Sequence, residues 1–221
     1  SRDSDVDLVF KNGLIVYWKF YEGDGTTALD SSGYNRHGLH TNMNGGDYVA
    51  GTAYLSYTNP FALDFDGSDD YVETNVDDSF EGMSAITVSA WINLDTLPDT
   101  ASEAIVSKFY DGTDRSWELM VEESGDGNQV YFNPSTDSVN DNTSANGTTV
   151  PTTGQWHHIA GTWDSSDDTI RIFFDGIEEN TASKSGNTIR TNNATARIGA
   201  HYYTNGGTND SELDGQIDDV R

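Results

Sequence analysis

Hydrophobic residues recur at every second position in short segments along the whole chain. Residues 14–20 and 86–92 show this most clearly, because their even positions carry only Leu, Val, Trp, Phe, Ile and Ala. A period of two predicts a β-strand with one buried face. Similar patterns predict further strands, at residues 63–65, 71–72, 104–109, 117–121, 129–132, 157–163, 170–174, 196–200 and 216–220. No segment shows a convincing helical period.

Short polar turns separate these segments. Asp175-Gly176 is one of them, and this dipeptide between two apolar runs predicts a tight hairpin. Many short strands with polar turns indicate an all-β, two-sheet antiparallel sandwich. We expect residues 1–12 to be a lead-in segment and residues 13–221 to form a single domain. The polar stretch 135–153 is expected to be a long loop at the rim of the sandwich.

The composition agrees with a folded domain of unusual charge. Aromatic residues make up 11% of the chain, more than a disordered acidic chain would carry. Asp and Glu number 37 and Lys and Arg only 11, which gives a formal net charge of −26. Nucleic acids and anionic membrane surfaces are therefore poor partners, because binding phosphate requires Lys and Arg.

The same charge predicts a high-salt environment. In dilute buffer, self-repulsion destabilises a compact state of this net charge. At 1 M salt the Debye length falls to about 3 Å, and the repulsion is screened. We therefore expect a halophilic source; a calcium-rich surface protein of a marine organism is the alternative.

The chain has no Cys, so no disulfide supports it. No apolar run approaches the roughly 20 residues of a membrane span, which predicts no direct membrane insertion. The chain opens abruptly at Ser1 and stops at Arg221 within a predicted strand, so we expect it to be part of a larger multidomain protein. Asn-x-Ser/Thr sequons agree with an extracellular location, although several would arise by chance in this composition; they begin at Asn142, Asn146, Asn193 and Asn209.

Several motifs follow one another in a fixed order along nearly the whole chain. Two of them are Leu63-Asp-Phe-Asp-Gly67 and Leu213-Asp-Gly-Gln-Ile-Asp-Asp-Val-Arg221; the others lie within residues 13–38, 69–72, 86–92, 105–108, 154–159, 174–176 and 197–199. The ordered set resembles the laminin-G-like jelly-roll family of the concanavalin A-like lectin and glucanase superfamily. The resemblance implies a jelly-roll sandwich. Family members usually continue past the equivalent of Arg221, so the closing strand is expected to be incomplete.

The resemblance also implies a structural calcium ion between one loop and the last strand. Its ligands would be Asp30, Asn35, the backbone oxygen of His37, and Asp218. Calcium takes six to eight oxygen ligands at about 2.3–2.6 Å, and such residues supply both carboxylate and carbonyl oxygens. The alternative is that Asp30 caps a turn and that Asp218 is a solvated strand residue.

A ligand site is expected on the concave sheet or its rim loops. Aromatic side chains beside carboxylates and amides suit sugars, because the ring stacks on the pyranose face and the polar groups bond its hydroxyls. Trp117 and Tyr131 have an alternative interpretation as core or sheet-face residues. The candidates are Tyr110, Asp111, Arg115, Trp117, Tyr131, Asn133, Tyr202 and Tyr203.

Two other clusters receive a structural interpretation. The cluster around Asp66-Gly67 lacks the Glu that an EF-hand needs at its twelfth position, where Asn75 stands, so we interpret Asp66-Gly67 as a hairpin turn. Adjacent strand residues point to opposite faces, so the rings of His157 and His158 cannot converge on one ion.

Catalysis is not expected. The nearest match to the laminarinase-type Glu-x-Asp-x-Glu signature runs from Glu212 to Gln216 and ends in an amide instead of an acid. Glu118 and Glu122 are spaced on one strand, but Met120 stands between them. The sequence thus predicts a non-catalytic extracellular or cell-surface domain that recognises a cell-surface glycan or a surface protein. A structural spacer and a glucanase-like hydrolase are the alternatives.

Overall fold

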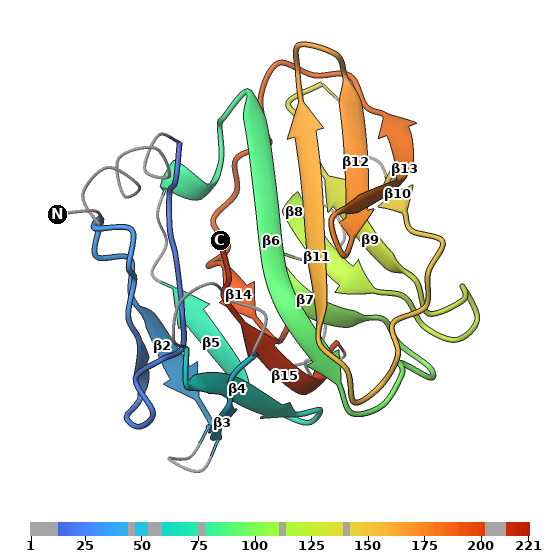
Figure 1. Cartoon of the computed structure of the whole chain (residues 1–221). Helices are drawn as coiled ribbons and strands as arrows, with labels where there is room; N and C mark the ends of the chain where they lie inside the picture. The colour runs from blue at the N-terminus through green and yellow to red at the C-terminus, as the bar shows by residue number, and fades with distance from the viewer. Residues whose placement is uncertain are drawn as a thin grey trace, which may run out of the picture.

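The computed structural model describes residues 13–43, 47–52, 59–74, 78–110, 114–138, 142–201 and 211–221. Two antiparallel sheets pack face to face, with β6, β11 and β12 in front of β7, β8 and β9 in Figure 1. The helical content of the described chain is one 3₁₀ turn, η1 (Asp78–Phe80). The predicted all-β, two-sheet antiparallel sandwich is confirmed. Among the residues that the structure describes, no helix has the length and apolarity that crossing a membrane requires.

The front sheet has seven strands. Its central pair, β6 and β11, is in register over eight residue pairs, from His157 opposite Ile92 to Asp164 opposite Ala85. In spatial order the strands are β13 (Ile177–Ser183), β12 (Thr169–Phe174), β11 (His157–Asp164), β6 (Ala85–Leu94), β15 (Asp214–Asp218), β4 (Phe61–Asp66) and β3 (Tyr48–Ala50).

The rear sheet has eight strands, and its order shows that distant segments cross between the layers. β14 comes from the C-terminal part of the chain, yet it lies between β5 and β7. In spatial order the strands are β1 (Thr27–Ala28), β2 (Gly38–Thr41), β5 (Tyr71–Thr74), β14 (Arg197–Ile198), β7 (Glu103–Tyr110), β8 (Asp114–Val121), β9 (Val130–Pro134) and β10 (Ala145–Asn146).

The hydrophobic core fills the space between the sheets. On β8 it receives Trp117, Leu119 and Val121, all at most 4% exposed. Across the sandwich, β11 contributes Gly161, where a Cβ atom would lie 2.2 Å from Cγ of Phe132 on β9. A glycine is therefore required there, because any side chain would force the facing aromatic ring away.

The chain ends differ from the predicted strands. Val16, Tyr17, Trp18 and Phe20 are buried, but in this segment only Trp18 makes ladder bridges, to Asp30 and to Val220. Phe20 has a left-handed φ of 53°, which interrupts the extended run. The predicted strand 196–200 is reduced to the two residues of β14, because Gly199 turns the chain at φ 79°.

Turn chemistry was predicted correctly at one dipeptide and incorrectly at another. Asp175 and Gly176 join β12 to β13 with φ values of 48° and 79°, as a two-residue hairpin with positive φ at both positions requires. Asp66 and Gly67 instead join β4 to β5, which belong to different sheets. The hairpin interpretation is therefore wrong there, and the turn is a corner between the layers.

Candidate functional site

A row of polar side chains crosses the outer face of the rear sheet. Consecutive cross-strand pairs join Glu73, Arg197, Ser107, Glu118 and Asn133, which belong to β5, β14, β7, β8 and β9 respectively. Their strand neighbours, such as Leu119 and Phe132, point into the core, so these five residues face away from it. We call this set the polar row.

Glu118 is one of the two carboxylates of the polar row and is only 6% exposed. Its Oε1 accepts a hydrogen bond of 3.0 Å from Nδ2 of Asn133, and its Oε2 lies 3.5 Å from Nε2 of His201. Burial raises the pKa of Glu118 to about 7, although Asn133 and the cations of Arg115 and Lys184 act in the opposite direction. Burial therefore favours the protonated form of Glu118 more strongly than water does.

His201 lies against this carboxylate as a neutral ring. Burial, together with the charges of Arg115 and Arg197, lowers the pKa of His201 to about 4. Its ring centroid lies 3.9 Å from that of Phe109, and the guanidinium carbon of Arg115 lies 5.3 Å from the same Phe109 ring. These three side chains form a mixed aromatic and cationic surface beside Glu118.

Arg115 brings an unused donor to this surface. Its Nε is buried and has no hydrogen-bond acceptor in the described part of the chain. A buried donor without an acceptor costs about 1–3 kcal/mol, and because this atom is shielded from solvent, a ligand oxygen could reach it only if the atoms that cover it moved. Tyr131 stands opposite Met120 on the same face; burial first, and then the charges of Glu118 and Glu122, raise the pKa of its phenol.

The predicted ligand residues fall into three groups: some lie on the outer face of the rear sheet, one lies in the core, and the side chains of the others lie outside the described part of the structure. Tyr131 and Asn133 lie on the outer face of β9, and Arg115 joins them there because a register shift separates it from Trp117 on β8 and its guanidinium lies near Phe109, Glu118 and Tyr131. Trp117 does not lie there: it is 4% exposed, belongs to the core, and donates from Nε1 to the carbonyl oxygen of Phe80 at 2.8 Å. Its assignment to a ligand surface is corrected to a packing role. The Tyr110 side chain lies outside the described part of the structure, and so do Asp111, Tyr202 and Tyr203.

Asp30, the first predicted calcium ligand, is a saturated turn cap. Oδ1 accepts the backbone N–H groups of Tyr17 (3.0 Å) and Ser32 (2.8 Å), and Oδ2 accepts the Ser32 hydroxyl (2.7 Å) and the Arg36 N–H (3.0 Å). Burial acts to raise the pKa of Asp30, but these bonds outweigh it and lower the pKa. The backbone N–H of Asp30 donates to Nδ1 of His37 at 3.0 Å, and Asn35 has a left-handed φ of 60° in the same loop.

Asp218, the fourth predicted ligand, lies apart from that loop. The backbone of Trp18 pairs with Asp30 and also with Val220, so this segment separates the loop from the end of the last strand. The carboxylate of Asp218 is 0% exposed and accepts from Nδ2 of Asn59 (2.6 Å) and from the N–H of Thr52 (3.1 Å).

A second oxygen near Asp218 has no donor. Nδ2 of Asn59 bonds both Asp218 and the carbonyl oxygen of Lys19, which fixes the orientation of the amide. Oδ1 of Asn59 is buried and has no hydrogen-bond partner within the described ranges. Burial raises the pKa of Asp218 to about 7. A buried carboxylate and a buried amide oxygen without a donor are oxygen ligands that suit a hard cation. The Asp30 carboxylate suits a cation less well, because its oxygens already accept four hydrogen bonds.

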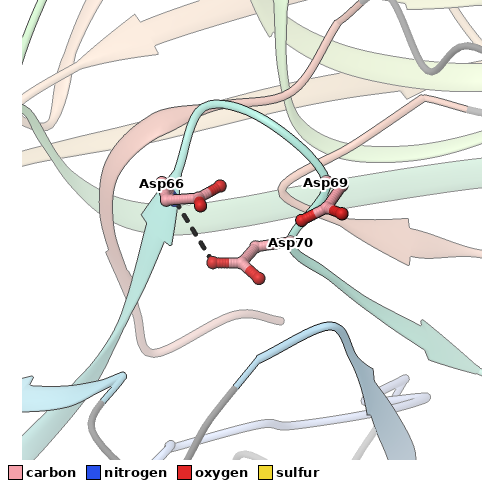
Figure 2. Close-up of side chains that lie close together, drawn as sticks. All are labelled: Asp66, Asp69 and Asp70. Atoms are coloured by element: carbon pink, nitrogen blue, oxygen red, sulfur yellow. Dashed lines mark hydrogen bonds between the residues drawn. The ribbon is translucent and has the colours of Figure 1, made fainter.

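Three acidic side chains meet at the corner between β4 and β5. Figure 2 shows Asp66, Asp69 and Asp70, whose carboxylate oxygens lie within 4.8 Å of one another. Asp70 accepts the backbone N–H of Asp66 at 3.3 Å, and burial, followed by the charge of Asp66, raises the pKa of Asp70 to about 6. Asp66 and Asp69 are exposed, as is ordinary in a chain with 37 acidic residues.

The two adjacent histidines behave as predicted. Nδ1 of His157 lies 2.9 Å from Oδ2 of Asp175, and the His157 ring contacts Phe174. The His158 ring instead packs edge-on against Trp91, with centroids 5.4 Å apart. The two rings have different neighbours and do not converge.

A cavity between the sheets does not suit a sugar. It has a volume of about 520 Å³ and is lined mainly by apolar side chains, among them Val16, Trp18, Phe80, Val88 and Trp117. Sugar hydroxyls would find few hydrogen-bond partners there.

The sequence profile of one family matches residues 66–221, well over half of the chain. It is a laminin-G family described as part of the concanavalin A-like lectin/glucanases superfamily. The chain therefore belongs to this superfamily, and the jelly-roll resemblance is confirmed. None of the curated proteins matches it.

Solved structures share the fold at low sequence identity. Domain 4 of AbnA, a GH43 extracellular arabinanase from Geobacillus stearothermophilus solved with arabinotriose, is 19% identical with a TM-score of 0.61, over 93% of this chain and 89% of that one. The binding domain of Paraclostridial Mosquitocidal Protein 1 is 13% identical with a TM-score of 0.68, over 95% and 48%. A botulinum neurotoxin type C structure, whose description states dependence of cell entry on two ganglioside molecules, is 15% identical with a TM-score of 0.65, over 96% and 48%. The chain spans about half the length of the two toxin structures.

Proposed function

We propose that this chain is a non-catalytic, glycan-recognition domain of an extracellular or cell-surface protein. The observation that carries the proposal is the convergence of Arg115, Tyr131 and Asn133 around Glu118 on the outer face of the rear sheet. They combine a guanidinium donor without an acceptor, an aromatic ring and an amide, which is the mixture that sugar recognition uses. The described binding of arabinotriose and gangliosides by proteins of this fold supports the ligand class.

The carboxylates do not support hydrolysis. Glu118 lies on β8 and Glu122 directly follows that strand, so four positions of extended chain separate their Cα atoms by about 13 Å. A retaining glycosidase holds its two carboxyl groups about 5–5.5 Å apart. Glu118 is also engaged by Asn133 and lies beside His201, and Glu122 is bonded by the amide of Asn146. The geometry favours binding over catalysis.

A glycan array in about 1 M salt tests the proposal. We expect the wild-type domain to bind a defined glycan set, and Arg115→Ala to weaken that binding about tenfold to a hundredfold, because a hydrogen bond to a charged group is worth about 1.5–3 kcal/mol. Arg171→Ala is the matched control, since this arginine pairs with Asp167 and Glu178 on the front sheet. A folded protein that binds no glycan would contradict the proposal and leave a protein partner or a spacer role.

We propose further that calcium is structural and is held by Asp218 and Oδ1 of Asn59. When bound, the ion would supply a positive charge to a buried carboxylate. Calcium at a hundred times its dissociation constant stabilises the folded state by about 2.7 kcal/mol, so a chelator is expected to lower the melting temperature. Asp218→Asn is expected to remove the chelator effect.

The comparison variant for this prediction is Asp30→Asn. Because the Asp30 carboxylate caps a turn through four hydrogen bonds, its loss is expected to lower the melting temperature equally with calcium and with chelator. If Asp30→Asn removes the calcium dependence and Asp218→Asn keeps it, the ion belongs to the loop instead.

The net charge of −26 supports a high-salt environment as part of the proposal. Raising the salt concentration from about 0.1 M to about 1 M shortens the Debye length from about 10 Å to about 3 Å. The midpoint of urea unfolding is therefore expected to rise over this range. A midpoint that falls or does not change would argue against adaptation to salt.

A further inference from the structure

Exposed large hydrophobic side chains gather in one part of the chain. Tyr21 is 47% exposed, Leu29 42%, Tyr34 59% and Leu39 55%, and all four belong to the segment 21–39. The other large hydrophobic side chains exposed in the described chain are Val150 and Ile177, on the opposite half of the sequence. Single exposed apolar residues need no explanation, but a local group of them marks a contact surface.

Two of these side chains line a surface hollow at the β1 edge of the rear sheet. The hollow is shallow and open to solvent, with a volume of about 500 Å³. Tyr21 and Leu29 supply its apolar part. The complete lining is Tyr21, Glu22, Asp24, Gly25, Thr26, Thr27 and Leu29.

Contacts with residues of both sheets hold the loop that lines the hollow. Oε1 of Glu22 accepts the backbone N–H of Leu29 at 2.9 Å, which closes the loop on itself. The carbonyl oxygen of Thr26 accepts from the N–H of His40 at 3.0 Å. Beneath the loop, Gly23 lies so close to the Phe61 ring that a Cβ atom would be 2.5 Å from it. The hollow is thus a preformed feature.

The chemistry of the lining matches one unit of a neutral sugar. Lys19 Nζ lies over one face of the Tyr21 ring, 5.9 Å from its centroid, so a pyranose would stack its C–H groups on the other face and on Leu29. Glu22 and the exposed Asp24 accept hydrogen bonds from sugar hydroxyls, and the exposed Thr26 both donates and accepts. Glu22 and Asp24 outnumber the cation of Lys19, which lies over the Tyr21 ring, so the remaining negative charge disfavours a sialic acid or a sulfated sugar.

We infer that this hollow is a second glycan subsite, which takes a neutral hexopyranose unit; the inference rests on the proposed glycan recognition. In the strand order, β1 is five strand steps from β8. At about 4.8 Å per step, the two sites are about 24 Å apart along the sheet. One extended oligosaccharide or two branches of one glycan would engage both sites, and the combined affinity would exceed either alone.

Saturation-transfer NMR with the intact chain in about 1 M salt tests the inference. The neutral probes are maltose, cellobiose and lactose, and 3′-sialyllactose is the anionic probe. We expect at least one neutral disaccharide to bind the wild-type chain, and Tyr21→Ala to weaken this binding at least tenfold. Tyr34→Ala is the matched control, because Tyr34 is more exposed than Tyr21 and does not line the hollow.

Arg115→Ala separates this inference from the proposed function. If Arg115→Ala abolishes binding of the neutral probes and Tyr21→Ala leaves it unchanged, the domain binds glycans but the Tyr21 hollow is not a subsite. Equal losses in Tyr21→Ala and Tyr34→Ala would also overturn it, as would wild-type signals from 3′-sialyllactose that Tyr21→Ala removes. If no disaccharide gives a signal with the folded wild-type chain, this inference fails, while the glycan array still decides the proposed function.

Discussion

Replacing Trp163 by alanine is expected to lower the free energy of unfolding by about 3–5 kcal/mol. The side chain is 1% exposed in the core, on β11 between the facing residues Ile86 and Ile170. Its Nε1 also donates to the carbonyl oxygen of Lys184 at 2.9 Å. The substitution therefore opens a cavity and leaves a buried carbonyl without its donor. Urea unfolding in about 1 M salt measures the change.

Ile177→Ala provides the control for this prediction. Ile177 begins β13 in the same sheet and is 70% exposed, so its truncation is expected to change stability by no more than about 0.5 kcal/mol. If Trp163→Ala costs no more than this control, Trp163 does not pack as the structure describes.

The strands that the sequence predicts best are the long interior strands of the front sheet. Residues 86–92 and 157–163 alternate regularly because β6 and β11 face the core on one side only. The segment 14–20 alternates as well, yet it forms single bridges at Trp18, because ladder formation depends on partners far along the chain. Local period determines which face is buried, but it does not determine which strand lies alongside.

The same reasoning explains the outcome at the candidate site. Trp117 could have been assigned to the core from sequence, because it shares the odd positions of β8 with Leu119 and Val121. The even positions of β8 face the other way, so Glu118 lies on the outer face of the sheet, where a buried carboxylate was not expected. Asn59 could not have been found at all, since its approach to Asp218 joins residues 159 positions apart and leaves no local pattern.

Replacing Glu118 by glutamine is expected to make the protein progressively more stable than the wild type as the pH rises from about 4.5 to about 8. Burial raises the pKa of Glu118 from 4.5 to about 7 in the folded state, so the folded chain binds more protons than the unfolded chain in this window. The stabilising contribution of the protonated carboxyl is complete below about pH 4.5 and is lost as the pH rises through 7. At 1.36 kcal/mol per pKa unit, the loss at pH 8 is about 3 kcal/mol.

Glutamine avoids this loss because it stays neutral and still accepts the hydrogen bond from Asn133. The opposite sign applies to His201, whose lowered pKa removes stability as the pH falls toward 4. If the unfolding free energy of Glu118→Gln also differs from that of the wild type below pH 4.5, the substitution has changed the titration of His201 through their contact. Unfolding free energies of the wild type, Glu118→Gln and the exposed control Glu178→Gln at several pH values measure these terms. If the difference in unfolding free energy between Glu118→Gln and the wild type does not grow between pH 5 and 8, the Glu118 carboxyl is solvated. The polar row would then be open to water at Glu118.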